Sequence, residues 1–257
     1  MNPNPRQLTL LSVVQAKGTV TVDELADTLG VTLQTVRRDV QRLADEGLLA
    51  RFHGGVRVPS STTENLAHQQ RESLNADGKQ RIARQVAQAV PNDCSLILNI
   101  GTTTEAVARA LLHHTGLRVI TNNLNVASIL STNPHCEVIV VGGVVRGRDQ
   151  GIVGEAAVDF IRQFKVDLAL IGISGIESDG TLRDYDYREV KVAQAIIDHA
   201  REVWLAADHS KFGRPAMVEL ARLSQINRLF TDAPPAPPFD SLLEAAGIRC
   251  TIAQDTP

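Results

Sequence analysis

The segment from residue 32 to residue 57 carries side chains whose types suit contacts with a DNA duplex. Arginine can bond guanine through two donors, glutamine can pair with adenine, and threonine can meet a phosphate or a thymine methyl group. The candidates for DNA contact are Thr32, Gln34, Thr35, Arg37, Arg38, Gln41, Arg51 and His53. The alternative is a solvated helix face whose arginines form salt bridges with Asp39 and Asp45. The surrounding helical pattern favours the DNA interpretation, since a recognition helix enters a major groove in such a frame.

Small and polar side chains also follow five apolar stretches in the C-terminal part and could hold a phosphorylated small molecule. A glycine at a strand end lets the backbone approach an anion, threonine hydroxyls and helix amides form a cradle, and a lysine neutralises charge. The candidates for effector binding are Gly101, Thr102, Thr103, Thr104, Asn122, Asn123, Gly142, Gly143, Ser174, Gly175, Asp184, Glu189 and Lys211. Phosphate is expected on the three threonines and the lysine. The alternative is ordinary turn and capping chemistry.

A carboxylate-rich stretch, residues 177–191, could in principle perform acid–base work on a sugar. We instead expect a polar loop whose carboxylates cap the following helix or bind ligand hydroxyls. The sequence contains no G-x-S-x-G, H-E-x-x-H or P-loop pattern, so those hydrolase, zinc-protease and NTPase signatures give no support. No catalytic residue, metal or cofactor is predicted.

The first 58 residues have the order of a winged helix-turn-helix domain. Leu8, Leu11 and Val14 recur at helical spacing, and Thr21 with Glu24 forms a capping box that starts a second helix. Thr32 can cap a third helix, and the stretch from residue 48 to residue 58 predicts a hairpin turning at Gly54-Gly55. We therefore predict a DNA-binding domain over residues 1–58 and a polar linker over residues 59–76.

Apolar strands alternate with helices through the rest of the chain, residues 77–257. Uninterrupted apolar runs such as 94–100, 117–121 and 166–171 are typical of strands buried on both faces. The fold class predicted is α/β, with a mostly parallel sheet covered by helices on both sides. We expect this domain to bind the effector and to form the oligomer contacts.

Composition excludes several classes of protein. The chain has 257 residues, 43% hydrophobic and 21% charged, which argues against wholesale disorder. There is no apolar run long enough to span a membrane, and the first residues lack a signal-peptide layout, so we expect a cytoplasmic protein without a membrane partner. The three cysteines lie in apolar runs and are expected to be buried. Net charge is −3, yet residues 1–58 carry seven basic and six acidic residues, which suits selective DNA contact.

The run from Thr32 to Val40, with Thr35-Val36-Arg37-Arg38-Asp39 at its centre, resembles the signature of the DeoR family of bacterial repressors. Its C-terminal part is similar to the sensor domain of that family, on the stretches Gly101-Thr102-Thr103 and Asp208-His209-Ser210-Lys211. The resemblance covers nearly the entire chain. It implies a sensor fold similar to ribose-5-phosphate isomerase.

A closer resemblance within the family is carried by the stretches 100–108, 121–127, 172–180, 208–213 and 231–235. It implies glycerol 3-phosphate as inducer, double-stranded operator DNA as partner, repression of glycerol-metabolism genes, and a homotetramer or homodimer. Ser174 and Gly175 stand where the isomerase pattern has acidic residues, which argues for binding without isomerisation. The alternatives are a repressor that responds to another sugar phosphate and an isomerase-like enzyme with a DNA-binding head.

Overall fold

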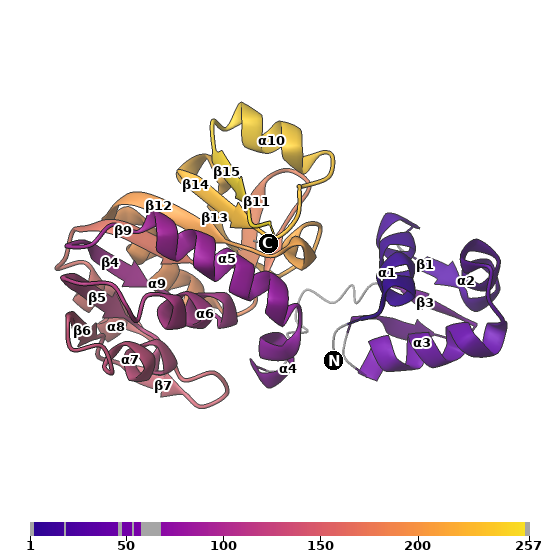
Figure 1. Ribbon diagram of the computed structural model, residues 1–257, viewed down its shortest axis with the longest axis horizontal. Coiled ribbons are helices and arrows are strands. Elements are labelled where there is room, and N and C mark those ends of the chain that lie inside the picture. Colours follow the sequence, from indigo (N-terminus) through magenta and orange to yellow (C-terminus); the bar gives the residue numbers. More distant parts are fainter. Residues whose placement is uncertain (1–2, 18, 46–47, 53, 58–67, 255–257) are drawn as a thin grey trace. The chain divides into compact units, whose positions relative to one another are not determined.

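A computed structural model describes residues 3–17, 19–45, 48–52, 54–57 and 68–254. They belong to two compact units, residues 1–74 and 75–257 (Figure 1). The predicted boundaries at residues 58 and 76 remain predictions. Within the predicted linker the structure describes a short helix, α4 (His68–Ser73), and the start of the next helix.

The N-terminal unit is a three-helix bundle with a small antiparallel sheet. Its elements are α1 (Pro5–Lys17), β1 (Thr19–Thr21), α2 (Val22–Leu29), α3 (Leu33–Asp45), β2 (Ala50–Phe52) and β3 (Gly55–Arg57). The sheet order is β1-β3-β2, so the predicted hairpin gains a third strand, β1, that the sequence did not suggest. The core contains Leu10 and Val14 of α1, Leu25 of α2, and Val36 and Val40 of α3, all at 0–2% exposure. On α1 the predicted spacing was only partly correct: Val14 is buried and Leu11 half-buried, but Leu8 is 44% exposed.

Two local features set the turns of this unit. The Thr21 side chain accepts a hydrogen bond from the Glu24 amide while Glu24 reaches back to the Thr21 amide, which confirms the predicted capping box. Gly30 ends α2 with φ 62°, a left-handed conformation that favours glycine. These turns fix the angle between α2 and α3, the two helices of the motif.

The C-terminal unit is built on a seven-stranded parallel sheet with the order β15-β14-β12-β9-β4-β5-β6. Its strands are β4 (Ser95–Leu98), β5 (Leu117–Thr121), β6 (Cys136–Val140), β9 (Val166–Ile171), β12 (Ala200–Ala206), β14 (Arg228–Thr231) and β15 (Arg249–Ile252). The chain begins in the centre with β4 and adds strands first on one side and then on the other. The strand order reverses next to β4, and ligands of open α/β sheets collect at such a point.

Helices cover both faces of this sheet. They are α5 (Ala76–Ala89), α6 (Thr102–Ala110), α7 (Leu124–Leu130), α8 (Glu155–Ile161), α9 (Tyr187–Asp198) and α10 (Phe239–Ala245). The C-terminal unit has a hydrophobic core on each face of the sheet, and alternate residues of β4 point into them. Leu96 and Leu98 belong to the core with α5, α6 and α7, whereas Ile97 belongs to the core with α8, α9 and α10. This three-layer arrangement confirms the predicted α/β fold class.

Antiparallel additions decorate the sheet and were not predicted. A hairpin is formed by β7 (Val144–Arg146) and β8 (Gly151–Val153), and a small sheet by β10 (Gly175–Ile176), β11 (Thr181–Asp184) and β13 (Val218–Arg222). The prediction of a loop over residues 177–191 is therefore wrong for β11. The capping part of that prediction is correct, because Asp186 accepts a hydrogen bond from the Arg188 amide at the start of α9.

The cysteines differ in their surroundings. Cys94 is buried, Cys136 is half-buried, and Cys250 is exposed, so the prediction of three buried cysteines is wrong for Cys250. That residue lies on the edge strand β15, where one face is not covered. In the described part of the chain, no helix is both long and apolar enough to cross a membrane.

Candidate nucleic-acid interface and effector site

Helix α3 exposes the polar side chains that the sequence singled out. Gln34, Arg37, Arg38 and Gln41 are exposed, while the opposite face of the helix is buried. The Thr35 amide donates to the Thr32 hydroxyl, so Thr32 caps the helix and the two hydroxyls lie 3.0 Å apart. A helix that is anchored on one side and cationic on the other fits a major groove.

The acid that follows the two arginines has a structural role. Asp39 is buried at 2% exposure; its carboxylate accepts Arg6 Nε at 2.6 Å and Gln7 Nε2 at 3.0 Å. It therefore ties α3 to the start of α1. Arg37 and Arg38 form no ion pair within the described residues. The alternative of an arginine face neutralised by Asp39 is thus not what the structure has.

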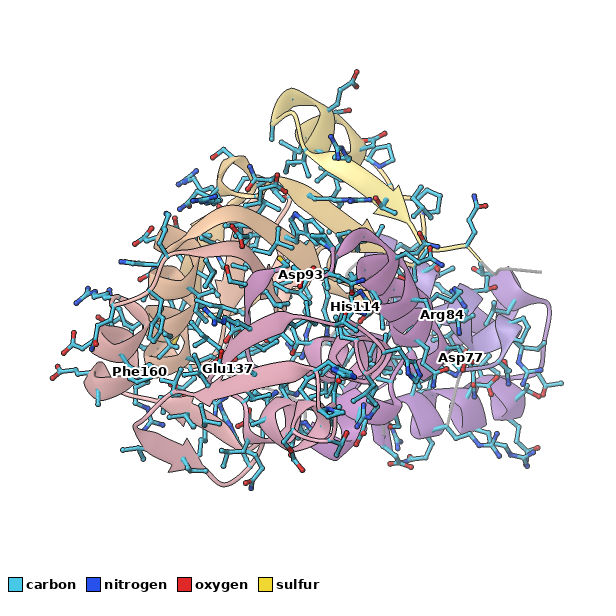
Figure 2. The ribbon with its side chains drawn as sticks, turned by 60° about the vertical axis from the view of Figure 1, so that its left-hand side comes forward. Asp77, Arg84, Asp93, His114, Glu137 and Phe160 are labelled. Atoms are coloured by element: carbon cyan, nitrogen blue, oxygen red, sulfur yellow. The ribbon has the colours of Figure 1, made fainter. Side chains whose placement is uncertain are left out.

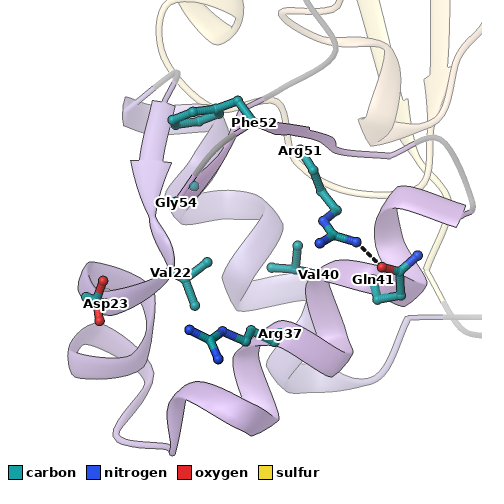
Figure 3. Close-up of a pocket in the computed structure, with 9 residues that line it drawn as sticks. Val22, Asp23, Arg37, Val40, Gln41, Arg51, Phe52 and Gly54 are labelled. Carbon is teal, nitrogen blue, oxygen red and sulfur yellow. Dashed lines mark hydrogen bonds between the residues drawn. The ribbon is translucent and has the colours of Figure 1, made fainter.

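A pocket of about 320 Å³ lies between α3 and the wing (Figure 3). Its lining includes Arg37 and Gln41 from α3, and Arg51 and Phe52 from β2. The Arg51 guanidinium donates to the Gln41 side-chain oxygen, and the Gln41 amide donates to Asp45 Oδ1 at 2.6 Å. Gln41 and Arg51 thus hold each other between helix and wing. His53 lies outside the described residues.

At the sheet of the C-terminal unit, the carboxyl ends of β12, β9, β4, β5 and β6 lie along one edge, as predicted from the parallel pattern. The five groups of predicted effector residues therefore share that edge. The ends of β6 and β12 are four strand spacings apart, roughly 19 Å at about 4.8 Å each. A three-carbon phosphate cannot reach from Gly142 and Gly143 to Lys211. The ligand site is therefore expected near the end of β4, in the middle of the sheet.

The turn after β4 brings a helix N-terminus to this middle position. Gly101 precedes α6 with φ 155°, and Thr102, Thr103 and Thr104 form the first turn, each at most 8% exposed. The Thr104 hydroxyl donates to the Asn99 and Gly101 carbonyl oxygens, both at 2.7 Å. Thr104 therefore braces the turn, and Thr102 and Thr103 remain the hydroxyls suited to an anion at the helix amides.

Three asparagines after β5 border the same turn. Asn123 donates to Glu105 Oε1 at 3.2 Å, and Asn125 donates to the same oxygen at 3.0 Å. The Asn122 amide donates to the Ile152 carbonyl of β8 at 3.2 Å, whereas its Oδ1 is buried without a hydrogen-bond partner in the described structure. Asn122 Oδ1 is thus a buried acceptor at this edge.

On the β9 side of the edge, Ser174 and Asp184 are joined directly. The Ser174 hydroxyl donates to Asp184 Oδ1 at 2.9 Å, and both residues are buried. Gly175 starts β10, where an added Cβ would lie 2.0 Å from the Arg214 carbonyl oxygen. Glycine at position 175 is therefore explained by close backbone approach.

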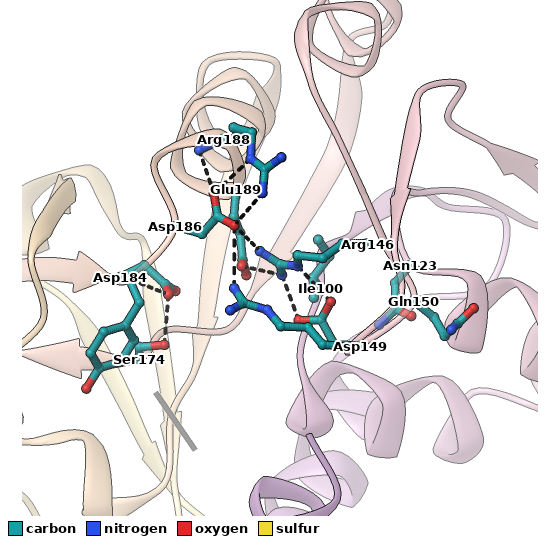
Figure 4. A network of polar contacts seen from close by, with 12 residues as sticks. Ile100, Asn123, Arg146, Asp149, Gln150, Ser174, Asp184, Asp186, Arg188 and Glu189 are labelled. Atoms are coloured by element: carbon teal, nitrogen blue, oxygen red, sulfur yellow. Dashed lines mark hydrogen bonds and ion pairs between the residues drawn. The ribbon is translucent and has the colours of Figure 1, made fainter. Parts of the chain in front are cut away.

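Arg146 connects the β7–β8 hairpin to α9 through a network of carboxylates (Figure 4). Its guanidinium donates to Asp149 at 2.6 and 2.8 Å, to Asp186 at 2.9 Å and to Glu189 at 2.5 Å. Its side chain is only 9% exposed. The Ile152 amide of this hairpin also donates to the Asn122 carbonyl oxygen at 2.7 Å. The network and this bond together hold the β7–β8 hairpin against the end of the sheet.

The same network perturbs two carboxyl groups in opposite directions. Burial and the nearby Asp184 carboxylate raise the pKa of Glu189 to about 7, although Arg146 opposes them. Burial also acts to raise the pKa of Asp186, but hydrogen bonds from Arg188 and Arg146 outweigh it and lower that pKa to about 2. Glu189 is held by Arg146 rather than directed at a substrate. Among the described residues, no group of three or more His, Cys, Asp or Glu side chains is arranged to hold a metal ion.

Lys211 belongs to a buried charged cluster at the ends of β12 and β14. It ends the short 3₁₀ helix η1 (His209–Lys211), which Asp208 caps. Asp208 is 1% exposed, and Lys211 is 8% exposed. Burial acts to raise the pKa of Asp208, but the charges of Lys211 and Lys79 outweigh it and lower that pKa. Asp232 follows β14 and accepts His209 Nδ1 at 2.8 Å.

Several residues of these sites were missed from the sequence. Arg146, Asp149 and Glu105 sit in no recognisable motif, since only the fold brings them to the others. Lys79 carried a usable signal: it precedes Ile82, Ala83 and Val86 of the same helix at intervals of three, four and seven residues, which places it on the buried face of α5. A lysine in the apolar stripe of a helix is rare without a buried partner.

The N-terminal winged helix-turn-helix and the C-terminal α/β unit define a DNA-binding regulator that carries a separate sensor domain. The chain belongs to the DeoR family of transcriptional regulators: residues 6–62 match the DeoR-like helix-turn-helix domain, and residues 74–233 match the DeoR C terminal sensor domain. The resemblance noted in the sequence is confirmed.

Individual relatives agree with this assignment. The glycerol-3-phosphate regulon repressor of Escherichia coli (strain K12) is 46% identical over 91% of this chain and 93% of its own length. The HTH-type transcriptional repressor CsqR of the same organism is 42% identical over 98% of this chain and 96% of its own. Among solved structures, a ribose 5-phosphate isomerase from Methanocaldococcus jannaschii matches with TM-score 0.40 and 16% identity, covering 54% of this chain and 55% of that chain.

Proposed function

We propose that this protein represses genes of glycerol and glycerol 3-phosphate metabolism and leaves its operator when glycerol 3-phosphate binds the C-terminal unit. The observation that carries the proposal is the 46% identity to the glycerol-3-phosphate regulon repressor, which extends over 91% of this chain and so includes both units. The protein acts in the cytoplasm, where both DNA and the phosphorylated inducer are present.

The N-terminal unit reads double-stranded operator DNA with α3 in the major groove. Gln34, Thr35, Arg37 and Arg38 face the bases and flanking phosphates. The support is the exposure of Gln34, Arg37 and Arg38 and the absence of ion pairs to either arginine among the described residues. Arg51 and the neighbouring His53 on the wing contact the adjacent backbone, with Gln41 between helix and wing.

The C-terminal unit holds the inducer at the carboxyl end of β4. Its phosphate lies on the α6 amides, the hydroxyls of Thr102 and Thr103, and the Lys211 ammonium. Its hydroxyl end faces the Asn122 and Asn123 side and the Ser174–Asp184–Glu189 side. The buried Asn122 Oδ1, which lacks a partner in the described structure, supports a hydroxyl donor at this position. The protein binds without isomerising, since Glu189 is engaged by Arg146.

Release from DNA follows from oligomeric geometry. Copies of the protein associate through their C-terminal units as a homodimer or homotetramer. The N-terminal units of two copies must then match the spacing of the two operator half-sites. An inducer that favours a different arrangement of the units lowers operator affinity by its differential binding to the two arrangements.

A panel of phosphorylated small molecules tests the effector. Full-length protein is heated with glycerol 3-phosphate, glycerol, ribose 5-phosphate, glucose 6-phosphate or inorganic phosphate, and the unfolding midpoint is recorded. Glycerol 3-phosphate should give the largest rise, and it alone should release the protein from a duplex selected out of a random library. No shift and no release with glycerol 3-phosphate would overturn the proposal.

A second candidate is a DeoR-type repressor that responds to a different sugar phosphate. This candidate is favoured by the similarity to CsqR, which is 42% identical over 98% of this chain. That identity is nearly as high as the 46% identity to the glycerol-3-phosphate regulon repressor. The same panel separates the two, because a sugar phosphate that shifts the midpoint more than glycerol 3-phosphate, and releases the duplex, assigns the protein to this candidate.

A further inference from the structure

We infer that Lys79 is a second lysine of the phosphate site and binds the inducer's phosphate together with Lys211. This inference rests on the proposed function, since it extends the same site by one residue. Lys79 lies in the first turns of α5, 23 residues before Thr102 in the chain, and is only 3% exposed. The fold, and not a motif, brings it to the site.

The start of α5 is fixed at the edge of the sheet where the strands end. Asn75, just before α5, donates to Asp232 Oδ2 at 2.7 Å, and Asp232 also accepts the His209 amide at 2.7 Å. Gly78 lies so close to Asp232 that an added Cβ would come within 2.5 Å of Oδ2. The helix therefore begins against the loop that carries Lys211.

Helices α5 and α6 lie side by side on one face of the sheet (Figure 1). Helix α6 starts at Thr102, with three residues between it and the end of β4, so both helices begin at the same end of the strands. The exposed side of α5 carries Asp77 and Arg84 (Figure 2), whereas Lys79 is on the buried side with Ile82. Lys79 is thus on the buried side of α5, close to Asp208 just after the end of β12.

The charges of this cluster suit a dianion. Lys79 and Lys211 both act on the buried carboxylate of Asp208, so two ammonium groups gather at this carboxylate. Asp232 is engaged by His209 and Asn75, and Arg81 lies near the imidazole. A buried ammonium group is costly unless an anion balances it. A phosphate placed on the α6 amides supplies that balance, and Asp208 acts as a positioning residue for both ammonium groups.

Calorimetry on full-length variants tests the assignment. Lys79→Met keeps most of the side-chain volume and removes the charge, and Lys191→Met, on the exposed face of α9, is the matched control. We expect the Kd for glycerol 3-phosphate to rise about tenfold to a hundredfold in K79M, as for loss of a charge-assisted bond to phosphate. K191M should bind like the wild type, and Lys79→Arg should recover part of the loss.

A second measurement needs no substitution. Glycerol 3-phosphate should slow hydrogen exchange at the amides of residues 78–82 in the wild-type protein, and glycerol should not, because only the phosphate engages Lys79. Unchanged affinity in a folded K79M, or unchanged exchange at these amides while the ligand binds, would overturn the inference alone. A wild type that binds no glycerol 3-phosphate would instead overturn the proposed function.

Discussion

The two units handle positive charge in opposite ways. On α3 of the N-terminal unit, Arg37 and Arg38 are exposed and have no ionic partner within the described residues. In the C-terminal unit, the Arg146 side chain is only 9% exposed and Lys211 is buried, and both lie near carboxylate groups of their own chain. The α3 surface suits a long polyanion that supplies all the negative charge, whereas the buried cluster suits a small anion that joins carboxylates already present.

This difference has a thermodynamic consequence. Exposed arginines gain affinity for DNA by releasing condensed counterions, so operator binding should weaken steeply with salt. A phosphate held by buried ammonium groups and helix amides is screened less. Selectivity between the two anions therefore comes from burial and not from net charge, which is −3 for the whole chain.

The largest effect is expected from Arg38→Ala. Loss of an exposed arginine that bonds base edges and phosphate should weaken operator binding at least a hundredfold in gel-shift titrations. The Kd for glycerol 3-phosphate should stay unchanged. Arg84→Ala, an exposed arginine of α5, is the matched control. Specific and tight operator binding by R38A would remove Arg38 from the DNA-reading surface.

Lys211→Met should have the next largest effect, and on the other unit. Loss of one ammonium group from the phosphate should raise the Kd for glycerol 3-phosphate about thirtyfold, while operator affinity remains that of the wild type. The variant should therefore stay on DNA at inducer concentrations that release the wild type. Normal release would show that Lys211 does not contact the phosphate.

Asp39→Ala tests whether the motif's acid serves structure and not recognition. It leaves Arg6 and Gln7 without their buried acceptor, so amides of α1 and α3 should exchange with solvent about tenfold faster. Asp45→Ala removes an exposed carboxylate of the same helix and should change exchange little. If D39A weakened DNA binding with native exchange rates, Asp39 would belong to the contact surface.

Sequence periodicity predicted the two units and the main sheet well, because buried faces repeat every two or 3.6 residues. The strands 117–121 and 166–171 have the predicted bounds. Capping chemistry is equally local, and the Thr21–Glu24 pair shows it. These features depend on neighbours within a few residues, so they can be read without the fold.

Contacts between distant segments could not be read in this way. Arg146 meets Glu189 across 43 residues, and Asn75 meets Asp232 across 157. The hairpin that carries Arg146 has three-residue strands, too short for a periodic pattern. The candidates do lie together at the carboxyl ends of the parallel strands, but the sequence did not reveal the buried charges around them.

A pH dependence carried by Glu189 is also expected. Its pKa is about 7 in the folded protein, above the ordinary glutamate value, because burial and Asp184 disfavour the charged form. Between these two pKa values the folded protein holds a proton that the unfolded chain has lost, so stability should fall as pH rises from about 5 to 8, by at most about 3 kcal/mol.

Glu189→Gln has no such proton, and its free energy of unfolding should lack this fall when measured by denaturant titration across that range. Asp186 is the opposite case in the same network, because its pKa is lowered to about 2 and its contribution to folding stability is lost only in acid. Asp186→Asn should therefore leave the change of unfolding free energy between pH 5 and 8 as it is in the wild type. An identical slope in E189Q and the wild type would mean that Arg146 keeps Glu189 ionised throughout. The sensor unit would then hold the β7–β8 hairpin through an ion pair at this position, as the Asp39–Arg6 ion pair helps to hold α3 against α1 in the N-terminal unit.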